Sequence, residues 1–462
     1  MTKGVLRIFN RSVPLRTVGL GIAETLLVFT TLLLAYRAGD GQYLAWTPAT
    51  YAQVAVVGSA ILFWLYCLGF YAPQVTTHQA HSVPRIIQAM GLTMLIAALF
   101  HTWLSLRIKV VTVLFGMVLA GAALTTSRYL FEEVARRPTL AEAAVVWGSG
   151  PLAVSLIREL RRRLDVGIRV LGMVDYAYAD DTFEGVPYLG PPEAIWTMAE
   201  SGQVRRMIVA IGERRGCLPV ERLMAAKAAG LNIEDGAEFY EELTGKVWLG
   251  AFTISLLLFS RRFAKSSVRL FLNRMFSVFF AVIALIIASP IMLITALLIR
   301  LDSDGPAILR QTRVGENGRH FTIYKFRSMN VGADRCSTLA PATRDDPRCT
   351  RVGKWIRRFR LDELPQLFNI LKGDMYFIGP RPFVPDQEAS LVCQIPYYRQ
   401  RWAVRPGATG WAQVHRGYCS SLEDNADKLS YDLFYIKNLS LGLDLLTLFK
   451  TFKVLLLGRG GR

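Results

Sequence analysis

The sequence predicts a membrane protein that combines α-helical and α/β parts. Apolar residues make up 52% of its 462 residues and charged residues only 19%, which is more apolar than is usual for a water-soluble chain. Long apolar runs fill the first part, and short β-branched runs alternate with helical patterns in the middle. Basic residues between Gly-Pro turns fill the last part. We therefore expect three domains, at residues 1–130, 140–250 and 270–462.

The first part contains four apolar runs, each about 20 residues long and hence long enough to cross a bilayer. Short loops separate them, and they lack the polar faces that would cover a soluble core, so transmembrane helices are favoured over buried core helices. Basic residues precede the first run and follow the fourth, which predicts that both ends are cytoplasmic. The four runs are Val18–Ala35, Tyr51–Tyr71, Ile86–Leu104 and Val110–Thr126.

A fifth apolar run, at residues 275–299, contains Ser289 and Pro290. A proline there removes a backbone donor and clashes with the carbonyl of Ile286, which bends the helix. Each half is then too short to cross the membrane. Arg274 and Arg300 flank the run, so we expect both ends on the cytoplasmic side and a re-entrant helix, with the Ser289 hydroxyl satisfying freed backbone groups. A kinked full span is the alternative.

The segment from Glu142 to Gly250 has a soluble composition and predicts a Rossmann-like α/β domain, because strand-like and helical patterns alternate. Gly148 and Gly150 follow the first strand and Asp175 follows the second, which approximates a dinucleotide-binding fingerprint. An ordinary strand-to-helix turn explains the glycines equally well. We expect a regulatory or assembly domain, with nucleotide binding left open. The predicted strands are Ala143–Trp147, Val166–Val174 and Arg206–Ile211.

The net charge of +18 indicates polyanionic partners such as anionic lipid, phosphorylated metabolites or nucleic acid. Nucleic acid is not expected, because no helix-turn-helix, zinc-finger or aromatic-basic RNP pattern occurs. The cysteines are single and form no C-x-x-C pair, so neither a disulfide framework nor a zinc site is indicated. They are Cys67, Cys217, Cys336, Cys349, Cys393 and Cys419.

The sharpest local pattern is the adjacent acid pair Asp362 and Glu363, followed by an apolar helical pattern that ends at Gly373. Pro365 is tolerated only in a first turn, so Asp362 is expected at or near the helix N-cap, where free N–H groups favour anions. Adjacent carboxylates on a helix point in different directions. One can therefore attack while the other binds Mg²⁺. A structural N-cap with a first-turn acid is the alternative.

Basic residues lie close to the acid pair in the sequence. Arg357 precedes the pair, Arg381 follows it between two prolines, and Lys325 and Arg327 lie in the segment Lys-Phe-Arg-Ser-Met. Arginines bind pyrophosphate bidentately, and prolines stiffen a loop before it binds. Together with the acid pair, this set predicts a pyrophosphate site rather than a solvated basic face.

Several segments of the chain, in their order and spacing, carry a resemblance to a known family. They are Ser289-Pro290, Lys325–Met329, Leu361–Leu367, Leu371–Met375, Gly379–Pro382 and Arg405–Gly410. The last part of the chain thereby resembles the bacterial polyprenyl-phosphate hexose-1-phosphate transferases, which begin exopolysaccharide and O-antigen repeat units. Four spans followed by a Rossmann-like segment are similar to the long form of that family.

The resemblance implies a transfer of hexose-1-phosphate from UDP-glucose or UDP-galactose to undecaprenyl phosphate. It implies that Asp362 attacks the sugar-linked phosphate and releases UMP, leaving an aspartyl-phosphosugar. It also implies that Glu363 holds the cofactor Mg²⁺. The basic residues implied in substrate binding are Lys325, Arg327, Arg357 and Arg381.

The resemblance further implies a multi-pass protein of the bacterial inner membrane with a mainly α catalytic domain in the cytoplasm. The expected partners are a UDP-sugar, undecaprenyl phosphate and membrane lipid, and a homo-oligomer is left open. A membrane-tethered nucleotide-sensing scaffold with a lipid-binding basic tail is the alternative function. It would make Asp362 dispensable.

Overall fold

The computed structural model of the protein describes residues 5–8, 11–39, 48–71, 83–104, 110–136, 141–176, 178, 180–212, 218–251, 267–330, 348–417 and 421–456. The chain forms two compact units, Met1–Leu243 and Thr244–Arg462. Cys67, Cys349 and Cys393 are free thiols. Cys217, Cys336 and Cys419 lie outside the described residues.

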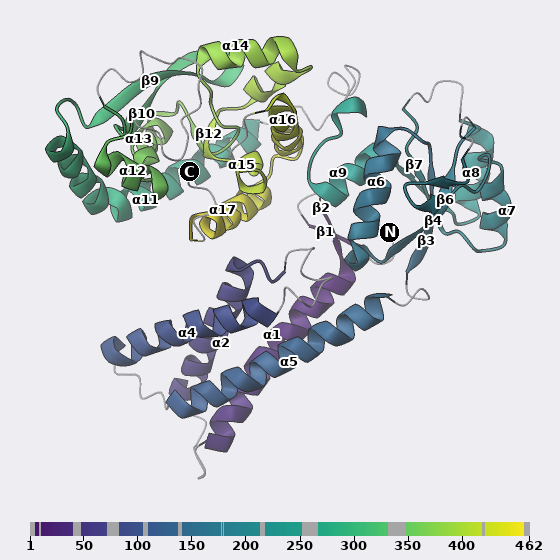
Figure 1. Ribbon diagram of the computed structural model, residues 1–462, viewed down its shortest axis with the longest axis horizontal. Helices are drawn as coiled ribbons and strands as arrows, with labels where there is room; N and C mark the ends of the chain where they lie inside the picture. Colours follow the sequence, from purple (N-terminus) through teal and green to yellow (C-terminus); the bar gives the residue numbers. More distant parts are fainter. Residues whose placement is uncertain are drawn as a thin grey trace. The chain divides into compact units, whose positions relative to one another are not determined.

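The first unit begins with a short antiparallel hairpin and four apolar helices, which lie where the sequence predicts them (Figure 1). A buried ion pair joins the first helix to the last, with Arg128 Nε 2.7 Å from Glu24 Oε1. The Arg128 guanidinium also lies over the ring of Phe70, 4.0 Å from its centre. The elements are β1 (Val5–Ile8), β2 (Arg11–Pro14), α1 (Leu15–Gly39), α2 (Pro48–Cys67), α4 (Val83–Leu104) and α5 (Val110–Arg136).

Within the described ranges, three helices are long and apolar enough to cross a membrane, so this is a membrane protein. Their spanning stretches are Leu15–Ala38, Val111–Ala135 and Ser267–Asp302. The apolar stretches of α2 and α4, Tyr51–Cys67 and Val83–Leu95, are shorter. The predicted helices are therefore confirmed, while the crossing of the membrane by all four of them stays a prediction.

The α/β part of the first unit is a four-stranded parallel sheet with the strand order β4-β3-β7-β8. Figure 1 shows α6 on one face of the sheet and α7 and α8 on the other, which is the layered arrangement predicted from the alternating patterns. The strands are β3 (Glu142–Trp147), β4 (Ile168–Val174), β5 (Thr182–Phe183), β6 (Val186–Pro187), β7 (Arg206–Val209) and β8 (Asn232–Asp235). The helices are α6 (Pro151–Arg162), α7 (Ala194–Glu200), α8 (Val220–Ala228) and α9 (Gly236–Thr244).

The predicted glycine turn lies between β3 and α6. Gly148 has φ of +125°, and a Cβ there would lie 2.9 Å from the carbonyl oxygen of Ala210, so only glycine fits this close approach of two strands. Gly150 is the N-cap of α6. Asp175 directly follows β4, so it lies at the same sheet edge as the two glycines. The strand order reverses between β3 and β7, and ligands bind at such a point in open α/β sheets.

The second unit contains the bent apolar helix α11 and a set of short helices and strand pairs packed on it. The hairpin of β9 and β10 pairs Lys325 with Leu309, and β11 pairs in parallel with β12. The strands are β9 (Ile308–Val314), β10 (His320–Phe326), β11 (Tyr376–Ile378) and β12 (Gly407–Thr409). The helices are α11 (Ser267–Asp302), α12 (Arg351–Arg358), α13 (Gln366–Lys372), α14 (Pro385–Gln394), α15 (Trp411–His415), α16 (Leu422–Lys437) and α17 (Leu441–Leu456).

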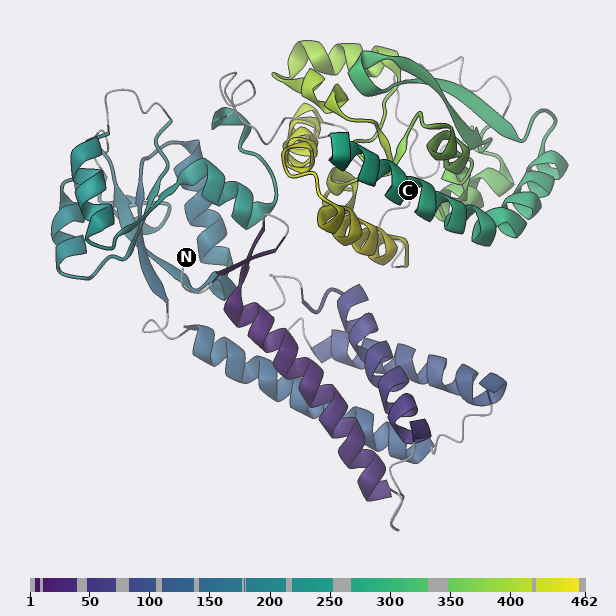
Figure 2. The same ribbon diagram turned by 180° about the vertical axis from the view of Figure 1, so that it is seen from behind.

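The helix α11 remains helical through Pro290, and its ribbon bends part-way along (Figure 2). The Ser289 hydroxyl donates to the carbonyl of Ile286 at 2.9 Å. This is the carbonyl that loses its helical donor to the proline, so the predicted role of the serine is confirmed. The bend is shown, whereas a re-entrant path through the membrane stays a prediction.

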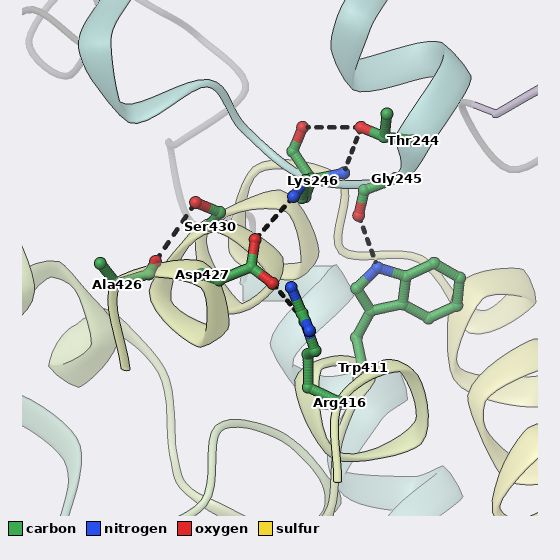
Figure 3. Close-up of polar contacts among 8 residues, drawn as sticks. All are labelled: Thr244, Gly245, Lys246, Trp411, Arg416, Ala426, Asp427 and Ser430. Carbon is green, nitrogen blue, oxygen red and sulfur yellow. Dashed lines mark hydrogen bonds and ion pairs between the residues drawn. The ribbon is translucent and has the colours of Figure 1, made fainter. Parts of the chain in front are cut away.

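A short segment before α11 is part of the second unit (Figure 3). Trp411 Nε1 donates to the carbonyl of Gly245 at 2.8 Å, and Lys246 forms a 2.6 Å ion pair with Asp427. Val247 is buried in the core formed by α16 and α15. The sequence-based boundary at residue 250 differs from this result, because residues 244–250 pack on the second unit rather than on the α/β sheet.

Candidate active site

The acid pair lies in a single 3₁₀ turn, η7 (Leu361–Glu363), between α12 and α13. Arg360 precedes the turn with φ of +56°, a left-handed conformation that is uncommon for a side chain of this size. The Arg360 side chain reaches Glu363, three residues further along the chain. Asp362 lies near the start of α13, as expected, but it is not the cap, because Pro365 is the N-cap of α13 and no side-chain cap hydrogen bond forms. The helix ends as predicted, with Gly373 at φ of +99°.

Two arginines hold the carboxylate of Glu363. Arg381 Nη2 lies 2.6 Å from Glu363 Oε1, and Arg360 Nη1 lies 3.4 Å from Oε2. Burial alone would favour the neutral acid, but the charges of Arg381, Lys325 and Arg360 together hold the pKa of Glu363 well below its usual range. Glu363 is therefore an anion at every physiological pH.

Asp362 has a different environment. No hydrogen bond or ion pair reaches its carboxylate from the part of the chain that the structure describes. Burial and the neighbouring charge of Glu363 raise its pKa to about 6, against the attraction of Lys325 and Arg381. The pair thus consists of one carboxylate fixed by arginines and one that is unengaged. A nucleophile requires a free carboxylate oxygen, and Asp362 provides it.

Lys325 supplies a partly buried cation beside the pair. Burial lowers the pKa of Lys325 to about 8, so its ammonium remains charged at neutral pH. Asn369 fixes the strand that carries it: Asn369 Oδ1 accepts from the Tyr324 N–H at 2.9 Å, and Nδ2 donates to the carbonyl of Thr322 at 2.7 Å. The helix that follows the acid pair therefore positions Lys325 next to that pair.

The two remaining residues predicted to bind substrate, Arg357 and Arg327, have different surroundings in the structure. Arg357 acts electrostatically on Asp362, whose pKa it lowers, and it donates to Cys349 Sγ at 2.9 Å. Arg327 is buried and donates to the carbonyls of Asp304 and Ser303 at 2.6 and 2.7 Å. Its contacts join the end of β10 to the end of α11, so its position supports a structural role and gives no support to the predicted substrate contact.

Arg401, which no sequence pattern singled out, positions the Arg381 loop. Its side chain is buried, and Nη2 donates to the backbone carbonyl of Arg381 at 2.9 Å. Asp432 balances its charge, with Oδ2 2.8 Å from Arg401 Nε, and Glu388 lies 3.5 Å from Nη1. Neither Arg401 nor Asp432 belongs to a recognisable motif, because the contact joins residues that lie far apart in the chain.

The donor chemistry of the acid pair fits Mg²⁺, which prefers a carboxylate or two together with substrate phosphates. The free oxygens of Asp362 are hard donors of this kind, whereas Glu363 would have to exchange an arginine for the metal. Among the described residues no group of three His, Cys, Asp or Glu side chains is placed to hold a metal. Phosphate oxygens and water would therefore complete the coordination.

An anionic pair surrounded by partly buried cations, on a unit built around an apolar helix long enough to enter a membrane, defines a membrane-bound enzyme of phosphate chemistry. The comparisons agree: residues 268–458 match the bacterial sugar transferase family, and residues 66–215 match a family described as a CoA-binding domain.

Relatives with known names cover different parts of the chain. The chain is 40% identical over 187 residues to the exopolysaccharide production protein PSS of Rhizobium leguminosarum bv. phaseoli, covering 39% of this chain and 94% of that protein. It is 29% identical over 445 residues to the UDP-glucose:undecaprenyl-phosphate glucose-1-phosphate transferase of Xanthomonas campestris pv. campestris, covering 92% and 90%. The chain belongs to the bacterial sugar transferase family.

A third relative is similar over less than half of the chain. It is the UDP-N-acetylgalactosamine-undecaprenyl-phosphate N-acetylgalactosaminephosphotransferase of Aeromonas hydrophila, 48% identical over 197 residues. The match covers 43% of this chain and 46% of the Aeromonas protein, so the chain spans about half the length of that relative.

Proposed function

We propose that this enzyme transfers a hexose-1-phosphate from a UDP-sugar, UDP-glucose or UDP-galactose, to undecaprenyl phosphate. The observation that carries the proposal is the division of the acid pair into an arginine-held Glu363 and an unengaged Asp362. Membership of the sugar transferase family and the names of its relatives support the choice of substrates. The product would start a polysaccharide repeat unit.

The reaction takes place in two displacements at phosphorus. A carboxylate oxygen of Asp362 attacks the phosphorus bonded to the sugar, the bond to the bridging oxygen breaks, and UMP leaves with the electron pair. The enzyme then carries an aspartyl-phosphosugar. A phosphate oxygen of undecaprenyl phosphate attacks the same phosphorus, and the Asp362 carboxylate is released with the lipid-linked diphosphate sugar as product.

The cations stabilise the charge that moves during both steps. Arg381 and Lys325 flank the pair, and Arg357 acts on Asp362 from the side of α12. Fixed positive charges in a partly buried site stabilise a transferring phosphoryl group without reorganisation at the moment of reaction. Glu363 keeps Arg381 and Arg360 in place and raises the pKa of Asp362. Mg²⁺, held by Asp362 or Glu363 and the substrate phosphates, would supply further neutralisation of the pyrophosphate.

We propose that α11 enters the cytoplasmic leaflet, bends at Ser289-Pro290 and returns, so that the acid pair faces the cytoplasm. The bend and the internal bond of Ser289 support this path, because a freed carbonyl is costly in lipid unless it is satisfied. A bacterial inner membrane is then the expected location. UDP-sugar would reach the site from the cytoplasm and the acceptor from the leaflet.

The α/β domain is a second candidate site. We propose that it binds a nucleotide-containing ligand at the edge formed by Gly148, Gly150 and Asp175. Its match to the family described as a CoA-binding domain and the reversal of strand order beside Gly148 support this proposal. A Gly148→Val protein that binds CoA and UDP as the unmodified protein does would argue against it.

The experiment that tests the main proposal uses membranes containing the full chain, undecaprenyl phosphate and Mg²⁺. A panel of UDP-glucose, UDP-galactose and UDP-N-acetylgalactosamine is assayed for release of UMP and for sugar in the lipid fraction. We expect UMP and lipid-linked sugar from either UDP-glucose or UDP-galactose. UDP-N-acetylgalactosamine is included because the Aeromonas relative is named for it. UMP or lipid-linked sugar from none of them would contradict the proposal.

A further inference from the structure

The loop Gly379–Pro382 carries Arg381, whose side chain lies 2.6 Å from Glu363. Two of its four residues are prolines, which have no backbone N–H, so the loop relies largely on its carbonyl oxygens for hydrogen bonds. Arg401 donates to the carbonyl of Arg381 at 2.9 Å, and the Gly407 N–H donates to the carbonyl of the first proline at 3.0 Å. Groups that hold these carbonyls therefore set the position from which Arg381 reaches Glu363.

A buried hydroxyl group lies between the start of this loop and α17. Tyr435 Oη of α16 is 3.1 Å from the carbonyl oxygen of Ile378, the residue directly before the loop, and 2.7 Å from Asp444 Oδ1 of α17. Tyr435 and Asp444 are each 2% exposed. A tyrosine hydroxyl has one proton, so it donates to one of these two oxygens and not to both. The second contact is a hydrogen bond only if the carboxyl group supplies a proton.

The surroundings of Asp444 favour the protonated carboxyl group. Among the described residues no cation acts on it, and burial raises the pKa of Asp444 to about 7, against the hydrogen bond from Tyr435. Asp432, a buried acid of α16, differs because Arg401 Nε lies 2.8 Å from its carboxylate. On β11, Tyr376 acts on Tyr435. Three further titratable side chains, on α11, α15 and α17, are bonded to other groups: Arg274, His415 and Lys450.

We propose that Asp444 and Tyr435 are positioning residues for Arg381: the protonated carboxyl group of Asp444 donates to Tyr435, and the Tyr435 hydroxyl donates to the carbonyl of Ile378. These two bonds join α17 to β11 at the start of the loop. When Asp444 loses its proton to solvent, the carboxylate accepts the Tyr435 hydroxyl proton instead, and the bond to Ile378 is lost. The proposal rests on the proposed function only where it assigns substrate binding to Arg381.

The test uses the full chain in a maltoside detergent, which has no carbonyl group to mask the infrared band of a protonated carboxyl group. The variants are Asp444→Asn, whose amide can donate to Tyr435 at every pH, and Tyr435→Phe, which removes both bonds. Asp386→Asn, a change of an exposed acid on α14, is the matched control. Infrared spectra, melting temperatures and the KM for the UDP-sugar are measured on both sides of the pKa of Asp444, at about pH 6 and about pH 8.

We expect the protonated-carboxyl band of the unmodified protein at about pH 6 to be weaker in Asp444→Asn and unchanged in Asp386→Asn. The melting temperature of the unmodified protein, relative to that of Asp444→Asn, should fall as pH rises to about 7 and stay level above it, because the folded state holds the proton more tightly than the unfolded state.

The KM for the UDP-sugar should rise about fivefold between the two pH values in the unmodified protein, because one hydrogen bond to the loop is lost. Asp444→Asn should keep the lower KM at both, whereas Tyr435→Phe should have the higher KM at both. The KM is measured because the rate at saturating UDP-sugar also depends on the charge of Lys325.

Two results would overturn the proposal. One is an infrared spectrum of Asp444→Asn with the same protonated-carboxyl band as the unmodified protein. The other is a KM that rises with pH in Asp444→Asn as it does in the unmodified protein. Failure of the proposed function is distinguishable: an unmodified protein that transfers no phosphosugar would overturn that function and the substrate contact of Arg381. The infrared band and the melting temperatures would still show whether Asp444 supplies the proton.

Discussion

At the residue scale, the two adjacent carboxylates differ in what surrounds them. Glu363 is held by Arg381 and Arg360, and its pKa lies well below the usual range. The pKa of Asp362 is raised to about 6 by burial and by Glu363. Carboxylates that differ in this way have different roles in a site, which supports the proposal that Asp362 attacks and Glu363 orders the arginines.

The pH dependence of UMP release follows from these groups. Asp362 must be ionised to attack, so the rate should rise as pH passes through about 6, and Lys325 must be charged, so the rate should fall through about 8. Rapid-quench measurements of UMP release without acceptor, over a buffer series, check this profile. Lys325→Arg should move the alkaline limb upward, because arginine keeps its charge.

Glu363→Gln provides the control on the acid limb. The negative charge of Glu363 raises the pKa of Asp362, so removing this charge should shift the acid limb of the pH–rate profile to lower pH. The loss of the arginine contacts should reduce the rate. An acid limb that stays in place in this variant would show that burial alone sets the pKa of Asp362.

At the element scale, α13 and β10 act together to position Lys325. Asn369→Leu keeps the volume but leaves the Tyr324 N–H and the Thr322 carbonyl unpaired, which should cost about 2–5 kcal/mol of stability. The rate of UMP release should fall and the alkaline limb should move, since the environment of Lys325 changes. Thermal unfolding and the pH profile measure the two effects, with exposed Phe368→Leu on the same helix as the control. An Asn369→Leu protein with a lower melting temperature but an unchanged alkaline limb would limit Asn369 to a structural role.

The path of α11 gives a second prediction at this scale. In a cysteine-free background, single cysteines placed before Arg274 and after Arg313 should both react only with a reagent supplied from the cytoplasmic side. Pro290→Ala restores the lost donor and removes the clash, so it should favour a straight helix and a mixed or inverted topology. Reaction of the second cysteine from the outside in the unmodified helix would contradict the re-entrant path.

Local pattern predicted the elements well and the contacts between them less well. The strands β3 and β4, the end of α13 at Gly373 and the bond of Ser289 to Ile286 follow from periodicity, glycine and proline chemistry. Asp362 lies near the start of α13 but does not cap it, because the left-handed Arg360 starts a separate 3₁₀ turn that no pattern in the sequence indicates. Arg401 was missed and the buried position of Arg327 unforeseen, since both depend on contacts with distant segments.

At the scale of the whole molecule, the boundary of the second unit lies before α11. Val247 is buried in its core, and Gly245 accepts the hydrogen bond of the buried Trp411 indole. Residues 244–250 follow the α/β domain in the sequence and contact α15 and α16 (Figure 3). The sequence could not place this boundary, because residues 244–250 have no pattern that distinguishes a linker from a core segment.

Two truncated proteins test this boundary. A chain beginning at Thr244 should fold and release UMP, because the acid pair and its cations all lie in the second unit. A chain beginning at Ser267 loses the burial of Val247 and leaves the Trp411 N–H unpaired, which should lower its stability by about 3 kcal/mol or more. Equal melting temperatures in detergent would show that the segment contributes nothing to the unit. Loss of turnover in the folded longer truncation would show that the site needs the first unit.

The covalent intermediate is the central claim, and the mass of the protein tests it most directly. With UDP-sugar and no lipid acceptor, the peptide containing Asp362 should gain the mass of one phosphohexose, and UMP should appear once per active site. Asp362→Asn should remain folded, because Asp362 makes no cap and its raised pKa means that ionisation above about pH 6 costs stability. That protein should gain no mass and release no UMP. Transfer of phosphosugar by Asp362→Asn, or UMP release only after lipid is added, would contradict the claim.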